Sequence, residues 1–96
     1  MELKATLEVA ISKQGNRYVA YAPALDISTS GKTQKQAKKR FGELVTIFFE
    51  ELEEAGTTDE VLSDMGWTKA GVAAQSQWVP PDMETDTIEI RVPVAA

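Results

Sequence analysis

Residues 33–56 read TQKQAKKRFGELVTIFFEELEEAG, and this stretch carries the strongest structural signal in the chain. Thr33 and Gln36 have the spacing of a capping box, in which the Thr33 hydroxyl accepts from the Gln36 N–H and the Gln36 side chain reaches back. Gly56 stands where a helix commonly ends. The pattern predicts a helix from about residue 34 to 55, with one apolar stripe made of Ala37, Phe41, Leu44, Val45, Phe48, Leu52 and Ala55.

The residues before this helix alternate with the period of β-strands. Residues 3–11 place apolar side chains on one face, which predicts a half-buried strand. Gln14-Gly15-Asn16 supplies turn chemistry, so residues 17–22 form the second arm of a predicted hairpin. Pro23 ends that strand because it cannot donate a ladder hydrogen bond. Residues 27–30 predict a short third strand.

The residues after the helix are less regular. Thr58–Asp64 predicts a short second helix, and residues 68–86 show no clear period. Asp86–Val94 alternates again and predicts a final strand, whose end lies at a sheet edge because of Pro93. The expected fold is α+β, in the order β-β-β-α-(α)-β, with an antiparallel-led sheet and one long amphipathic helix on one face. We expect a core over residues 1–67, and a segment 68–96 whose strand completes or extends the sheet.

Composition narrows the possible functions. The 96 residues include neither Cys nor His, which removes the usual nucleophile–base pairs and the commonest metal ligands. An enzyme would have to work with carboxylates, Lys, Tyr, Ser or Thr alone, so composition disfavours an enzyme, and we expect no metal and no cofactor. No stretch reaches the roughly 20 apolar residues that cross a bilayer, and the start has no apolar leader, which favours a cytoplasmic protein without a membrane partner. A domain this small gains stability by associating, so a homodimer or higher homo-oligomer is expected.

Charge is segregated along the predicted long helix. Five bases and no acid lie between Lys32 and Arg40, whereas eight acids and no base lie between Glu43 and Asp64. This order opposes the helix dipole, which favours acids at the N-terminus and bases at the C-terminus. Either the basic turn binds a phosphate or an acidic partner and the acidic end binds a basic partner, or both are solvated helix surface.

Three apparent motifs fail on inspection. Gly31-Lys32-Thr33 imitates the end of a phosphate-binding loop, but Asp26 stands where the first Gly is required. Residues 82–86 resemble the opening of a calcium loop that lacks its later Gly and Glu. Tyr18 and Tyr21 have opposite strand parity, so they cannot form one stacking platform for a nucleic acid.

Two stretches carry a family resemblance. Residues 18–25, YVAYAPAL, and residues 29–37, TSGKTQKQA, together with the long helix, resemble the HicB-like antitoxin family over about residues 5 to 55. The resemblance implies a partial ribonuclease-H-like fold without the nuclease carboxylates. It also implies a non-enzymatic antitoxin that binds and neutralises a small, basic, mRNA-cleaving HicA-type toxin. Many members add a DNA-binding module, but the residues after Trp67 leave no room for one, so DNA binding is not expected.

Two other functions remain open. The chain can be a standalone homo-oligomeric domain of the same fold with no toxin, or a carboxylate-dependent hydrolase that uses Asp26. For partner binding we select Tyr21, Pro23 and Leu25, because residues at strand ends and in loops often bind. The residues expected at oligomer contacts are the off-stripe and final-strand apolar ones: Ile47, Phe49, Ile88, Ile90 and Val92.

Overall fold

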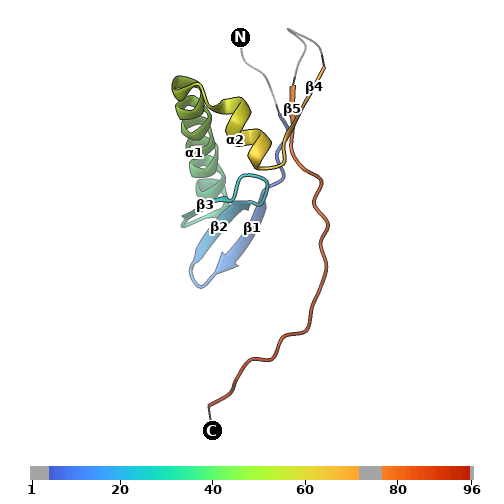
Figure 1. Ribbon diagram of the computed structural model, residues 1–96. Helices are drawn as coiled ribbons and strands as arrows, with labels where there is room; N and C mark the ends of the chain where they lie inside the picture. The colour runs from blue at the N-terminus through green and yellow to red at the C-terminus, as the bar shows by residue number, and fades with distance from the viewer. Residues whose placement is uncertain (1–4, 72–76, 96) are drawn as a thin grey trace.

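A computed structural model describes residues 5–71 and 77–95, and its architecture is α+β (Figure 1). The elements in chain order are β1 (Ala10–Gln14), β2 (Arg17–Ala22), β3 (Ile27–Gly31), α1 (Gln34–Ala55), α2 (Thr58–Asp64), β4 (Thr68–Ala70) and β5 (Gln77–Val79). A three-stranded antiparallel sheet is followed by the long helix, the short helix and a two-stranded sheet. The predicted fold class is confirmed.

The first sheet has the strand order β1-β2-β3. Gln14 lies opposite Arg17, so two residues make the turn between β1 and β2. Gly15 opens that turn with a φ of 64°, a left-handed value that Gly adopts without steric cost. The pairing continues along both strands and places Ile11, Ala20 and Thr29 side by side on one face of the sheet.

Helix α1 begins and ends where the sequence predicts. The Thr33 hydroxyl accepts from the Gln36 N–H at 3.0 Å, and Gln36 Oε1 accepts from the Lys32 N–H at 2.7 Å. Gly56 closes the helix in the left-handed region with a φ of 67°. The chain turns tightly from β3 into α1, because a Cβ on Gly31 would lie 2.7 Å from the Ala37 backbone nitrogen.

The core consists of two clusters that share α1. The first joins the sheet to the helix through Ala20, Ala22, Ala37 and Phe41. The second lies under α2 and contains Leu25, Leu62 and Trp67. Small alanines at the first contact let α1 lie close to β2 and β3, so the helix covers one face of the sheet as expected.

Trp67 ties the second cluster to the loop between β2 and β3. Its ring is 3% exposed, and its Nε1–H donates to the Ala24 carbonyl at 2.9 Å. The bond joins positions 43 residues apart in the chain. A buried indole needs such a partner for its N–H, so this contact fixes where α2 ends relative to the sheet.

The first strand is shorter than predicted and lies further along the chain, since the prediction covered residues 3–11 and β1 extends to Gln14, which was expected in the turn. The strand β1 starts at Ala10, and residues 5–9 belong to no helix or strand; Leu3 lies outside the described residues. Leu7 and Val9 nevertheless pack on the same core as Ile11, while Glu8 is exposed. The predicted two-faced alternation therefore continues upstream of β1, but no described strand pairs with that stretch.

The final strand predicted over Asp86–Val94 is wrong for the single chain. Residues 80–95 belong to no helix or strand; Pro81 still lies beside Gly66, and the chain beyond it extends away from the sheet and helices (Figure 1). We call residues 86–94 the C-terminal arm. The radius of gyration is 16.7 Å, against about 13 Å for a compact domain of this length. An alternating sequence defines two faces, but a strand also needs a neighbouring backbone, and the arm has none among the described residues.

The arm therefore does not complete the three-stranded sheet, and the small pairing of β4 with β5 occupies part of the segment for which no period was seen. Within the described ranges, no helix has the length and apolar character needed to cross a bilayer.

Candidate functional site

The outer face of α1 carries the most distinctive exposed surface. Residues Glu43, Ile47, Glu50 and Glu54 follow one another at spacings of four, three and four, which places them on one side of the helix. That side is opposite the buried Ala37 and Phe41. We call these four residues the acidic stripe. Ile47 is 50% exposed, so the stripe presents an apolar side chain between carboxylates.

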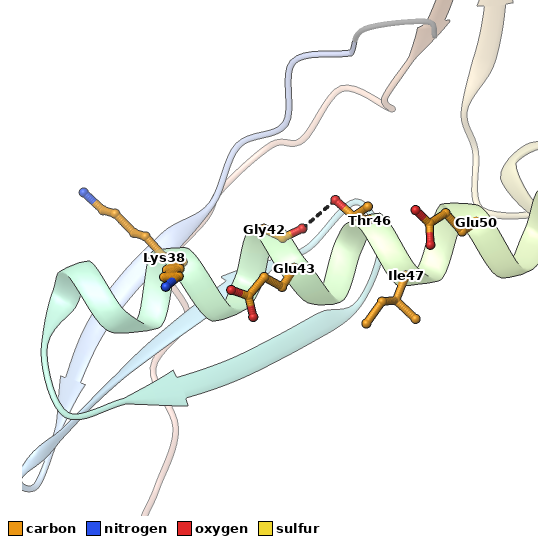
Figure 2. Close-up of a pocket in the computed structure, with 7 residues that line it drawn as sticks. Lys38, Gly42, Glu43, Thr46, Ile47 and Glu50 are labelled. Atoms are coloured by element: carbon orange, nitrogen blue, oxygen red, sulfur yellow. Dashed lines mark hydrogen bonds between the residues drawn. The ribbon is translucent and has the colours of Figure 1, made fainter. Parts of the chain in front are cut away.

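A shallow hollow on α1 overlaps the acidic stripe and includes Gly42. It is lined by Lys38, Lys39, Gly42, Glu43, Thr46, Ile47 and Glu50 (Figure 2). Gly42 has no side chain, and the Thr46 hydroxyl donates back to the Gly42 carbonyl at 2.9 Å. Because of these two features, little side-chain volume projects from the helix surface at this point. The hollow can receive a protruding side chain, but it does not enclose a small molecule.

The charges around α1 are as segregated in space as in the sequence. The first turn of the helix has no acid, and the last turn has no base. All eight acids from Glu43 to Asp64 are exposed, and within the described ranges only Asp59 pairs with a base, at 3.9 Å from Lys69 Nζ. On α1 each charge misplaced in a terminal turn opposes the helix dipole by roughly 0.3–1 kcal/mol, whereas Asp59 and Glu60 lie in the first turn of α2, where the dipole favours them. Asp59 pairs with Lys69 and Glu53 accepts from the Thr58 hydroxyl, whereas the exposed carboxylates of the acidic stripe are available to a cationic partner.

At the other end of the helix, Arg40 has a structural contact. Its Nη1 donates to the Ser30 carbonyl of β3 at 3.1 Å. The neighbouring lysines of the basic turn, Lys32, Lys35, Lys38 and Lys39, are exposed.

The three residues selected for partner binding do not form one surface. Leu25 is 2% exposed and packs with Leu62 and Trp67, which corrects its expected surface role. Pro23 is exposed in the loop. The Tyr21 hydroxyl donates to Asp26 Oδ1 at 2.9 Å, and this hydrogen bond, with some desolvation and the nearby negative charge, raises the pKa of Tyr21. Tyr21 thus holds Asp26, whose φ of 53° is unusual for a residue other than Gly.

The five residues selected for oligomer contacts divide into two groups. Phe49 is half-buried and packs edge-on against Phe48 and Trp67, with ring centroids 5.3 Å and 6.4 Å apart. Phe49 therefore widens the second core cluster within the single chain. The others remain at the surface: Ile47, Ile88, Ile90 and Val92.

The described residues offer no metal-binding arrangement. Across residues 5–71 and 77–95, no three acidic side chains gather where they could hold an ion. Gly31-Lys32-Thr33 forms the turn and cap before α1, not a phosphate-binding loop. Residues 82–86 lie in the extended segment beyond Pro81. The acidic stripe was not recognised as a unit from the sequence, although its helical spacing was present there.

Comparison with known proteins gives no relative: no protein-family model matches the chain, and neither the curated proteins nor the solved structures include a match.

Proposed function

We propose that the chain is a non-catalytic, HicB-like antitoxin that binds and neutralises a small, basic, mRNA-cleaving HicA-type toxin in the cytoplasm. The observation that carries the proposal is the acidic stripe with its exposed Ile47. The family resemblance of residues 18–37 suggests what kind of partner carries the complementary charge.

The physical basis is complementary charge. A protein that binds RNA presents lysine and arginine side chains to the phosphates, and an acidic helix attracts the same side chains. The net charge of −5 and the cluster of carboxylates on α1 and α2 steer a cationic partner toward this face. Ile47 then supplies an apolar contact at the centre, where interfaces gain most of their affinity. Occupying the basic surface excludes the RNA, so no chemistry is required of this chain.

The test uses a small basic protein encoded beside this gene, purified with and without the chain. We expect a stable complex and loss of RNA cleavage. Replacing Glu43, Glu50 and Glu54 together by Gln slows association by roughly tenfold, since rim charges act mainly on the on-rate. Ile47→Ser is expected to speed dissociation instead. Association rates at two salt concentrations separate the two effects.

The matched control neutralises three exposed acids outside the stripe: Asp82→Asn, Glu84→Gln and Asp86→Asn. It makes the same change in net charge, and we expect it to alter the association rate by less than about twofold, because the charges lie away from the docking face. The proposal is overturned if no adjacent small basic protein binds, or if the chain cleaves RNA by itself.

A second candidate, a standalone homo-oligomeric domain with no toxin partner, is favoured by a different observation. Four exposed apolar residues line the C-terminal arm, and a chain that stays alone gains nothing from them. This candidate is supported over the antitoxin if the chain forms a homo-oligomer and binds none of the cationic proteins tested.

A further inference from the structure

The C-terminal arm has the pattern of a strand but no neighbour. Ile88, Ile90, Val92 and Val94 alternate with polar residues and are 82%, 73%, 71% and 89% exposed. A solvated apolar stripe beside unpaired backbone is a template for pairing with another strand. We therefore expect the arm to pair with the edge of a sheet whose apolar face continues the apolar face of the arm.

The outer edge of β3 is already occupied in part. The pair Gln14–Arg17 closes a two-residue hairpin, and such closing pairs are hydrogen-bonded to each other. Hydrogen-bonded and non-hydrogen-bonded pairs alternate along an antiparallel ladder, so on β3 the backbone groups of Thr29 and Gly31 point toward β2. The carbonyls of Ser28 and Ser30 therefore point away from β2. Arg40 donates to the Ser30 carbonyl at 3.1 Å, and α1 lies over this side of the sheet.

Among the described residues, the outer edge of β1 has no neighbouring strand. By the same alternation, the N–H and C=O groups of Val9, Ile11 and Lys13 point away from β2. No described strand pairs with this edge. The apolar side chains beside it, Leu7, Val9 and Ile11, all reach the core. Residues 5–13 thus offer a free edge as long as the arm, with apolar side chains on the face toward α1.

We propose that the C-terminal arm of one copy of this chain adds as an antiparallel strand to the β1 edge of a second copy, so that two chains exchange arms. The pairing places Ile88 opposite Ile11, Ile90 opposite Val9 and Val92 opposite Leu7. Each pair continues the apolar face of the second copy's sheet.

Charge selects this register over its neighbours. With Ile90 opposite Val9, the outward-facing Arg91 lies opposite Glu8, and oppositely charged cross-strand pairs are favourable. A shift of two residues in one direction brings Glu89 opposite Glu8, which is repulsive. The same shift in the other direction brings Pro93 opposite Glu8 and loses the ion pair.

Pro93 selects the antiparallel direction. In an antiparallel pair with the apolar faces aligned, the arm residues that bond to Val9, Ile11 and Lys13 are the even-numbered ones. Pro93 then turns its missing N–H away from β1, at no cost in ladder bonds. In a parallel pair the odd-numbered residues bond to β1, so Pro93 would leave one acceptor unpaired.

A second copy suits the arm better than its own sheet. In the single chain the arm runs clear of β1 (Figure 1). Pro80 and Pro81 hold its exit in an extended conformation. Residues 81–86 then span up to about 20 Å, which lets the arm cross to a neighbour.

Engineered cysteines test both the register and the partner, because the chain has no Cys of its own. Ala10 and Glu89 face each other in a non-hydrogen-bonded pair, whose Cα separation of about 4.5 Å permits a disulfide. We mix a tagged Ala10→Cys variant with an untagged Glu89→Cys variant and oxidise them. A tagged–untagged disulfide dimer supports the proposal. Its absence overturns it, as does equal cross-linking of Ser28→Cys with Glu89→Cys, which reports the β3 edge.

The double variant Ala10→Cys/Glu89→Cys separates exchange from folding back. A covalent dimer supports exchange, whereas a disulfide within single chains overturns it. Sedimentation of the unmodified chain is expected to show twice the 10.5 kDa mass. Ile90→Asp is expected to give single chains that keep the helical circular dichroism signal of α1 and lose only the strand signal of the paired arm. The matched Ile47→Asp variant, altered on α1, is expected to stay dimeric; a single-chain mass for it would move the contact to the helix and overturn the proposal.

Discussion

Residues 5–13 and the C-terminal arm share one sequence pattern but differ in environment. Both carry four apolar side chains at every second position, at residues 5, 7, 9 and 11 in the first stretch and at residues 88, 90, 92 and 94 in the arm, although Ala10 interrupts the polar face of the first. In the first stretch, Leu7, Val9 and Ile11 pack on the core between sheet and helix, whereas in the arm Ile88 and Val94 stay more than four-fifths exposed. An alternating sequence therefore makes a stretch able to form a two-faced strand. Whether the stretch pairs and is buried depends on a neighbouring backbone and on a layer that covers its apolar face.

The largest expected effect is the loss of Trp67. Trp67→Ala removes a ring that is 3% exposed and leaves the Ala24 carbonyl without its donor. We expect the free energy of unfolding to fall by about 3–5 kcal/mol, the usual cost of deleting a buried aromatic ring. Urea denaturation measures it. The matched change in the arm, Ile88→Ala, should cost less than about 0.5 kcal/mol at a concentration where single chains predominate, and equal losses at the two sites under that condition would break the comparison.

A second test concerns how closely the chain turns from β3 into α1. Gly31→Ala would place a Cβ 2.7 Å from the Ala37 backbone nitrogen, so the helix must move. We expect a loss of about 1–3 kcal/mol, as for other overpacked sites. Gly42→Ala is the control within α1, because nothing lies within 4 Å of its Cβ. That change should add about 0.5–1 kcal/mol of stability through helix propensity. An unchanged free energy of unfolding for Gly31→Ala would show that the turn from β3 into α1 can shift to accommodate a methyl group.

A smaller effect is expected at the β2–β3 loop, from pH. The hydrogen bond to Asp26 raises the pKa of Tyr21, so the folded state favours the protonated phenol. Its contribution to stability is present below the ordinary tyrosine pKa of about 10 and is lost as pH rises through the higher folded value. Asp26→Asn should move the pKa of Tyr21 back toward its ordinary value. Phenolate absorbance during an alkaline titration measures this, and an unchanged curve would contradict the assignment.

The smallest effect is expected from removing the arm. Deleting residues 86–96 should change the free energy of unfolding by less than about 0.5 kcal/mol, measured at a concentration where single chains predominate, because the arm makes no contact that buries its apolar residues. At higher concentrations the full chain should gain stability and the truncated chain should not. A large loss in the dilute sample would mean that the arm folds back on its own sheet.

The sequence alone determined the local elements whose signals are local. The cap at Thr33, the stop at Gly56 and the apolar stripe set α1 to within a residue, and the Gly15 turn and Pro23 delimited β2. These signals depend on backbone geometry and on hydrogen bonds between residues close in the chain, so they can be recognised from the sequence before the fold is known. The chemistry of the outer face of α1 was also present in the sequence, since helical spacing alone aligns Glu43, Ile47 and Glu50.

Only the tertiary structure decided which apolar residues are buried in the core and which stay exposed. Leu25 and Phe49 were expected to meet partners, and both pack under α2, because Trp67 returns to the Ala24 carbonyl 43 positions away. The same period-two pattern gave a packed edge at Val9 and an exposed arm at Ile90. Periodicity specifies which side chains share a face, whereas burial depends on what covers that face, and that covering comes from residues distant in the chain.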